Sequence, residues 1–171
     1  MSQQMESPTP TINGIEYFPV MLSFLEKIGI PTRMEKIDTT TFVPGLQIEN
    51  GVLVIDMEKM LYPGDVLHEA GHIAVTPKDQ RSSLSDVSGD GNEIAAIVWS
   101  YAAAKEIGVP EEILFHPHGY KDQSDWLIEE YNSGNYIGLP LLEWMGFTAA
   151  PKKAAELNVP PYPHMLRWLR E

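Results

Sequence analysis

The chain has 171 residues, enough for one domain with a proper core, and its 24 acidic side chains against 12 Lys and Arg give a formal charge of −12. This excess of acid argues against binding to nucleic acid or to anionic membranes, because both require concentrated positive charge. A mean hydropathy of −0.18, the absence of cysteine and the lack of an apolar run near about 18 residues predict a globular cytoplasmic protein without disulfides or a membrane span.

Residues 1–13 are rich in Ser, Gln, Thr and Pro, which predicts a flexible tail ahead of a single domain over residues 14–171. The tail lacks the basic start and the apolar core of a secretory signal. The first helix is predicted over Phe18–Ile28, where apolar residues recur at helical spacing until Gly29, with Pro31 beyond. The apolar positions of this helix are Val20, Met21, Phe24, Leu25 and Ile28.

A β-hairpin is predicted next. Residues 39–48 are mostly β-branched or apolar, but Pro44-Gly45 interrupts them, which favours an edge strand or a bulge. Asn50-Gly51 is a strong signal for a two-residue hairpin turn. Val52–Ile55 then follows as a strand that is too apolar to have a face in water.

The central motif is His68-Glu69-Ala70-Gly71-His72, which reads H-E-x-x-H. On a helix the two histidines lie on one face with Cβ atoms about 6 Å apart, so both imidazoles can reach one metal ion. Glu69 lies roughly 100° further round the helix, where its carboxylate can take a proton from a water that the metal activates. The alternative is an exposed pair of histidines without a role.

The flanking residues predict the helix that this spacing requires. Asp65 is a good N-cap after Pro63-Gly64, and Pro77 stops the pattern, which gives a helix over about residues 66–75. Gly71 is an unusual choice, because glycine within a helix costs about 1 kcal/mol relative to alanine. Either another backbone packs closely there or a bound ligand needs the room. The expected core contacts are Leu67, Ala70, Ile73 and Ala74.

A catalytic zinc takes three protein ligands and a water, so a third ligand is needed. Glu93 is the best candidate, since it lies at the start of the apolar run 91–104, which predicts a buried helix ending near Ile107 before Gly108. A carboxylate is costly to bury there unless it is paired or binds a metal. The alternative is a first-turn acid that faces water and is favoured by the helix dipole. Other candidate ligands are Asp86, Asp90, His116 and His118.

HExxH followed in the next helix by Glu-x-x-Ala resembles the gluzincin branch of zinc metallopeptidases, and most nearly its small ImmA/IrrE type. In that type a short helix and a β-hairpin precede a His-Glu-x-Gly-His helix. The resemblance covers residues 20–107 and implies that His68, His72 and Glu93 bind zinc and that Glu69 is the general base. The residues that carry it are His68, Glu69, Gly71, His72, Glu93 and Ala96, with a hairpin at about 41–56.

The resemblance also implies that an edge strand, 41–48 or 52–56, pairs with an extended peptide substrate. The pentapeptide His-Glu-Ala-Gly-His is also similar to the motif of membrane-tethered AAA proteases. Those proteases need a Gly-x-x-x-x-Gly-Lys phosphate loop and a membrane anchor, and this sequence contains neither.

Residues 77–91 predict a polar loop between the two helices that carry the candidate ligands. Residues 86–91 resemble the beginning of a calcium loop, but the EF-hand pattern needs a glutamate at its twelfth position, where Ile97 stands. Calcium is therefore rejected, and the loop is expected to cover the site or to stay mobile.

Zinc peptidase chemistry also needs a donor, usually His or Tyr, that steadies the oxyanion of the tetrahedral intermediate. The segment 116–120 offers His118 and Tyr120, which are retained as candidate catalytic residues. The alternative is a surface turn whose histidines have no role. Further candidates are His116, Tyr131 and Tyr136.

The C-terminal half predicts several short helices. Residues 111–115 can add a helical turn, and Ser124 caps a helix over residues 125–132 with Trp126, Leu127 and Ile128 inward. Further helices are predicted over residues 139–145, Pro151–Leu157 and residues 163–169. The last is amphipathic, and its apolar stripe is interpreted as core packing rather than a partner site. That stripe consists of Met165, Leu166, Trp168 and Leu169.

Together these features predict a mostly helical α+β fold, a minimal zincin-like domain in which a small sheet or hairpin precedes the metal-binding helix. The predicted function is Zn²⁺-dependent hydrolysis of a peptide or other amide, with a peptide or protein as the substrate. The alternative is a non-catalytic zinc-containing binding or regulatory module with a peptidase-like fold. In that module a side chain, rather than water, would fill the fourth coordination position.

Overall fold

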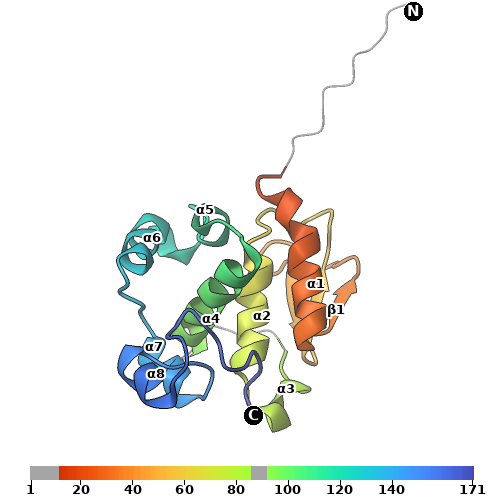
Figure 1. Ribbon diagram of the computed structural model, residues 1–171. Coiled ribbons are helices and arrows are strands. Elements are labelled where there is room, and N and C mark those ends of the chain that lie inside the picture. The colour runs from red at the N-terminus through yellow and green to blue at the C-terminus, as the bar shows by residue number, and fades with distance from the viewer. Residues whose placement is uncertain (1–11, 86–91) are drawn as a thin grey trace, which may run out of the picture.

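The computed structural model describes residues 12–85 and 92–171 (Figure 1). Nearly all of the predicted tail, and the loop 86–91 with the candidate ligands Asp86 and Asp90, lie outside these residues. The predictions for both segments therefore stay predictions.

Two closely packed helices, α2 (Asp65–Val75) and α4 (Asn92–Ile107), form the centre of the molecule. Figure 1 shows α1 (Phe18–Ile28) and the sheet on one side of this pair, and the helices of the C-terminal half on the other. The fold is mostly helical α+β, with a small sheet that precedes α2 in the chain, as the sequence predicts.

Within the described ranges the sheet consists of β1 (Thr32–Met34), β2 (Leu46–Glu49) and β3 (Val52–Ile55), in the order β1-β3-β2. Strands β2 and β3 pair antiparallel, with Leu46 opposite Ile55. The turn residues Asn50 and Gly51 have φ angles of 50° and 75°, the left-handed conformation that a tight hairpin turn requires. The predicted hairpin is therefore confirmed.

The strand predicted within residues 39–48 lies at an edge, as one of the two alternatives had it, but the strands differ from the prediction in length and in number. The strand predicted within residues 39–48 begins only at Leu46, because Gly45 has a φ of 73° and lies so close to the backbone of Met60 that a Cβ would clash. Strand β1, which no local pattern indicated, pairs parallel with β3. Consequently β3 is the central strand, and 52–56 is not an edge that could pair with a peptide, whereas β2 lies at an edge.

Helix α1 has the predicted bounds and ends where Gly29 adopts a φ of 93° and its N–H bonds the carbonyl oxygens of Leu25 and Glu26. The buried face runs through Phe18, Met21 and Leu25. Val20, although one of the apolar positions of the helix, lies off this face and is exposed. The predicted loop after α2 contains a short helix, α3 (Lys78–Arg81).

The C-terminal half contains α5 (Glu111–Leu114), α6 (Ser124–Asn132), α7 (Leu139–Trp144) and α8 (Pro151–Leu157). These four helices confirm the ones predicted from residue 111 to residue 157. Ser124 is the first residue of α6, and its side chain caps no backbone N–H. Leu127 is buried, but Trp126 is exposed rather than inward as predicted. Short 3-10 turns, η1 (Ile15–Tyr17) and η2 (Tyr120–Asp122), precede α1 and α6.

The helix predicted over residues 163–169 is wrong, because this segment is irregular. Its backbone groups bond to distant parts of the fold instead of to one another. Leu166 N–H donates to the carbonyl of Phe147 at 2.8 Å, and the carbonyl of Trp168 accepts from the Trp99 indole at 3.1 Å. The Trp168 ring packs edge-on against Phe24, with centroids 4.9 Å apart, as the interpretation of core packing predicts, whereas Leu166 of the same stripe is exposed.

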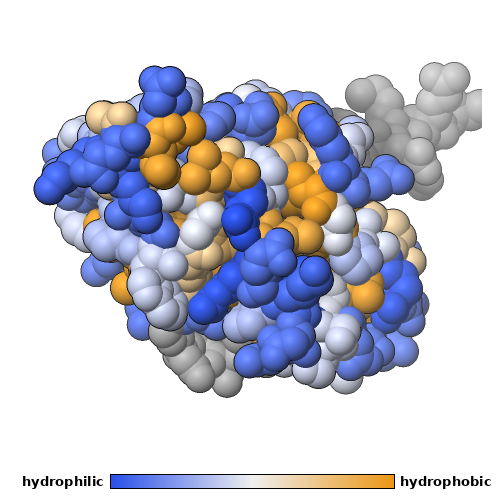
Figure 2. Space-filling view, turned by 60° about the horizontal axis from the view of Figure 1, so that its bottom comes forward, coloured by the Kyte–Doolittle hydropathy of each residue, from blue (hydrophilic) through white to orange (hydrophobic). Residues whose placement is uncertain are grey.

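The core lies between α1, the sheet, α2 and α4, and includes the fully buried side chains of Ile55, Leu67 and Trp99. Figure 2 shows one face of the molecule, on which apolar residues form small groups between hydrophilic ones. Across residues 12–85 and 92–171, none of the helices has both the length and the apolar character needed to cross a membrane.

Candidate metal centre

The residue that caps the N-terminus of α2 is not the predicted one. The helix begins at Asp65 and Gly64 is the N-cap residue, with no side-chain hydrogen bond to the first turn. A Cβ on Gly64 would collide with the carbonyl oxygen of Ile113, so this position cannot take an ordinary capping residue. The carboxylate of Asp65 instead lies 2.7 Å from Nε2 of His116. Asp65 thus belongs to the site and does not cap the helix.

Gly71 allows α2 and α4 to approach closely. A Cβ at this position would lie 2.9 Å from the carbonyl oxygen of Ala96 and 3.2 Å from Cε3 of Trp99. Of the two explanations offered for this glycine, close backbone packing is therefore the correct one. All the core contacts predicted for α2 are fully buried, namely Leu67, Ala70, Ile73 and Ala74.

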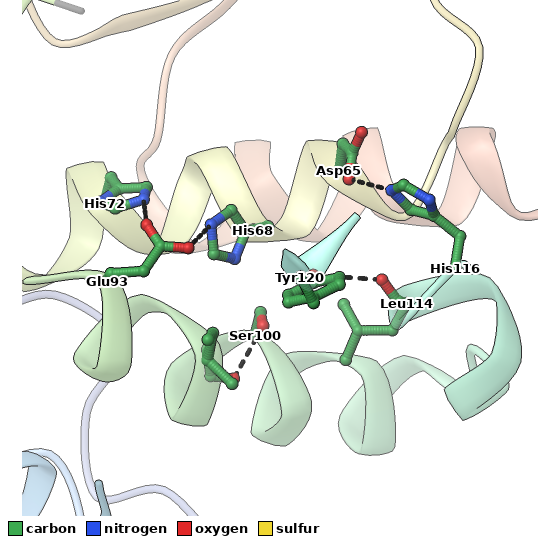
Figure 3. Close-up of polar contacts among 9 residues, drawn as sticks. Asp65, His68, His72, Glu93, Ser100, Leu114, His116 and Tyr120 are labelled. Carbon is green, nitrogen blue, oxygen red and sulfur yellow. Dashed lines mark hydrogen bonds and ion pairs between the residues drawn. The ribbon is translucent and has the colours of Figure 1, made fainter. Parts of the chain in front are cut away.

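The close approach brings Glu93, at the start of α4, onto the two histidines of α2. Nε2 of His68 lies 2.9 Å from one carboxylate oxygen of Glu93, and Nε2 of His72 lies 3.0 Å from the other. Figure 3 shows the carboxylate between the two imidazoles, with α2 and α4 running antiparallel. One ligand atom from each residue falls within 4.8 Å of the others. The alternatives of an exposed histidine pair and of a glutamate facing only water do not fit this arrangement.

Burial and charge shift the pKa values of the ionisable groups in the cluster in different directions. The hydrogen bonds from His68 and then His72 hold the pKa of Glu93 well below its ordinary value. Burial lowers the pKa of His68, but the hydrogen bond and charge of Glu93 outweigh it, so the net shift of that pKa is upward. Burial raises the pKa of Glu69, which is partly buried beside the histidines.

These residues fit a zinc ion by the chemistry of their donor atoms. Two imidazole nitrogens and one carboxylate oxygen are a ligand set that catalytic zinc sites use. The histidines are buried, whereas the Glu93 side chain keeps 46% of its surface exposed, so the cluster has a side open to water. Among the described candidates, His116 pairs with Asp65 instead, and His118 is exposed with its ring 5.4 Å from that of Tyr62.

The candidate oxyanion donors take different places. The Tyr120 ring lies edge-on to His68, with centroids 5.5 Å apart, but its hydroxyl donates to the carbonyl of Leu114 at 3.2 Å. In Figure 3 this hydroxyl points away from the cluster. Tyr131 donates to the carbonyl of Ile137 and, like Tyr136, packs among other aromatic rings. The roles predicted for His118 and Tyr120 stay predictions.

The pairing between Asp65 and His116 joins two distant segments of the chain and was not predicted from the sequence. Tyr62 stacks on the imidazole of His116 with ring centroids 4.0 Å apart and planes within 9°. Both members of the pair are buried, and Nδ1 of His116 has no hydrogen-bond partner among the described residues. The available signal was that Asp65 lies three residues before His68, on the same face of one helix.

One hollow lies beside the Asp65–His116 pair, and a larger one lies away from the candidate metal cluster. A cavity of about 240 Å³ borders the Asp65–His116 pair and is lined by Tyr62, Pro63, Ile113, His116 and His118, among others. A larger groove of about 620 Å³ is formed by α1, the end of α4 and the C-terminal segment, and no cluster residue lines it. Volume alone therefore does not mark the centre, which is defined by its donor atoms.

Comparisons of this chain with protein-family models, curated proteins and solved structures found no match. What can be said of function therefore depends on the motif and on the geometry of the cluster.

Proposed function

We propose that this protein is a zinc-dependent metallopeptidase or a related amide hydrolase. The observation that carries the proposal is the convergence of His68 and His72 from α2 with Glu93 from α4. The resemblance to the ImmA/IrrE type of gluzincin supports the same assignment of ligands. A peptide or protein substrate and a cytoplasmic location belong to the proposal as well.

His68, His72 and Glu93 would hold the zinc, and the exposed side of Glu93 would give water access to it. Zinc bound there would polarise a substrate carbonyl and lower the pKa of water to about 7. Glu69 follows His68 by one residue and is partly buried beside the cluster. Its carboxylate accepts the proton of the attacking water and returns that proton to the leaving amine.

The oxyanion of the intermediate needs a fixed donor, and His116 is the most firmly held of the candidate donors. Its ring is held by the carboxylate of Asp65, one helical turn before His68, and by stacking on Tyr62. Tyr120 would first have to release the carbonyl of Leu114, and His118 has no comparable anchor in the described part of the chain.

The direct test measures metal content and peptide hydrolysis in the same preparations. Wild-type protein should bind about one zinc per chain and cleave members of a peptide library. Glu69→Gln should retain the zinc but lose activity by at least about 100-fold, the lower end of general-base contributions. Glu156→Gln, an exposed change on α8, is the matched control and should alter neither property.

Wild-type protein that binds no zinc would contradict the proposal. Loss of zinc from Glu69→Gln would make that residue a ligand rather than the base. Zinc-loaded protein that cleaves no peptide or amide would favour the non-catalytic module.

A further inference from the structure

The two candidate histidine ligands lack the hydrogen bond that normally orients such rings. A metal-binding histidine usually donates its second ring N–H to a carboxylate, a carbonyl or water, which fixes the ring. Here Nδ1 of His68 and Nδ1 of His72 are both buried and have no partner in the part of the chain that the structure describes. Beyond their contacts with Glu93, the orientation of these imidazoles therefore depends on packing.

His68 is packed between two rings. On one side the imidazole of His72 meets it nearly perpendicularly, with centroids 5.0 Å apart and an interplanar angle of 88°. On the other side Tyr120 meets it at 5.5 Å and 82°. Figure 3 shows Tyr120 between α2 and α4, next to His68. Tyr120 is thus the neighbour of His68 that is not itself a candidate ligand.

Tyr120 is held in place from its far side. Its hydroxyl donates to the carbonyl of Leu114 at 3.2 Å, and its ring meets Phe115 edge-on at 5.2 Å. A ring fixed in this way can act as a wall for the imidazole beside it.

The backbone takes an unusual path to deliver this ring. Gly119 passes under the imidazole of His116, where a Cβ would lie 2.9 Å from Cε1. Tyr120, Lys121 and Asp122 then have φ angles of 57°, 52° and 62°. Three successive left-handed residues that are not glycine persist only where the surrounding structure holds them. Such backbone strain tends to occur at functional sites, and here it places Tyr120 against His68.

We infer that Tyr120 is a positioning residue, whose ring holds the imidazole of His68 in the orientation that directs Nε2 toward Glu93 and the metal. The inference rests on the proposed metal centre. It assigns the effect to the aromatic ring, because the hydroxyl is engaged with Leu114 and turned away from the cluster.

Cobalt(II) is the probe, because its affinity can be titrated and its visible spectrum reports ligand geometry independently of catalysis. Tyr120→Phe keeps the ring and should bind Co²⁺ within about twofold of wild type, with the same spectrum. Tyr120→Leu should weaken binding by about 10- to 100-fold, the range seen when the group orienting a metal-binding histidine is removed, and should alter the spectrum. If Tyr120→Leu does not fold, Tyr120→Met fills the space with a flexible chain and carries the same expectation.

Tyr136→Leu is the matched control. This partly buried ring contacts Tyr101, Tyr131 and Tyr162 and neither histidine, so its loss should lower stability without changing Co²⁺ affinity. Equal affinity in wild type and in a folded Tyr120→Leu or Tyr120→Met variant would overturn the inference. If Tyr120→Phe lost as much Co²⁺ affinity as Tyr120→Leu, the inference would also be overturned, because the effect would then belong to the hydroxyl. Wild-type protein that binds neither Co²⁺ nor Zn²⁺ would instead contradict the proposed function.

Discussion

Gly71 shows how a single residue decides whether two helices can approach closely enough to bring the candidate metal ligands together. Helix propensity alone favours alanine there by about 1 kcal/mol. The packing acts in the other direction, because a methyl group would press on the carbonyl of Ala96 and on the ring of Trp99. Overpacking of a close interface typically costs about 1–3 kcal/mol, so the contact outweighs the propensity at this position.

Gly71→Ala should therefore lower the free energy of unfolding by up to about 2 kcal/mol net, the difference between these two effects. It should also weaken zinc affinity, because any shift of α4 carries Glu93 away from His68 and His72. Urea unfolding and a zinc titration measure the two effects. A more stable variant would mean that the interface yields easily and that the glycine is not needed for packing.

The candidate ligands could be predicted because each gives a local signal. His68 and His72 are marked by their spacing, and Glu93 by a carboxylate at the start of an apolar helix. The Asp65–His116 pair and the Tyr120–His68 contact join segments far apart in the chain. No local pattern indicates which side chains will meet across such a distance, so neither contact could be read from the sequence.

Among the elements, prediction succeeded where an element is specified by its own residues. Helix α1 is bounded by Gly29, and the hairpin by Asn50-Gly51. Strand β1 was missed because it is defined by its partner: Thr32–Met34 becomes a strand by pairing with β3. The C-terminal segment 163–169 has a helical apolar pattern, but carbonyl and N–H groups elsewhere in the fold compete for its backbone.

Asp56 connects the end of β3 to two neighbouring segments. Its carboxylate accepts hydrogen bonds from the backbone N–H of Ile37 at 2.9 Å and of Glu58 at 3.0 Å. The bond from Ile37, followed by that from Glu58, lowers the pKa of Asp56 in the folded protein despite burial. The ionised carboxylate is therefore bound more favourably in the folded state than in the unfolded chain.

This lowered pKa predicts an acid-sensitive contribution to stability. The contribution is fully present above the ordinary pKa of 3.8 and is lost as the pH falls below it, through the lower folded value. Asp56→Asn removes the titrating group. The unfolding free energy of this variant should therefore be lower than that of wild type at pH 7, and the two values should converge in acid. Urea midpoints measured across this pH range test the prediction. A difference independent of pH would show that the effect is steric.

At the scale of the whole molecule, the C-terminal segment fastens the two central helices together. Arg170 N–H donates to the carbonyl of Ala74 at 3.0 Å, near the end of α2. The carbonyl of Trp168 accepts from the indole of Trp99 on α4. The Trp168 ring also packs edge-on against Trp99 at 5.8 Å, and Trp99 is the side chain that lies beneath Gly71. The segment thus supports the same interface that brings the candidate metal ligands together.

Trp168→Ala should consequently destabilise the whole domain and loosen the centre together. Trp168 is only partly buried, so we expect a loss of about 2–3 kcal/mol in unfolding free energy, below the roughly 3–5 kcal/mol of a fully buried tryptophan. Zinc affinity should fall as well, because Trp99 loses a neighbour at the α2–α4 contact. Trp144→Ala is the control: this ring is 74% exposed and its main partner is Arg170, so its removal should cost at most about 1 kcal/mol. Equal losses in the two variants would mean that the C-terminal segment does not brace the interface.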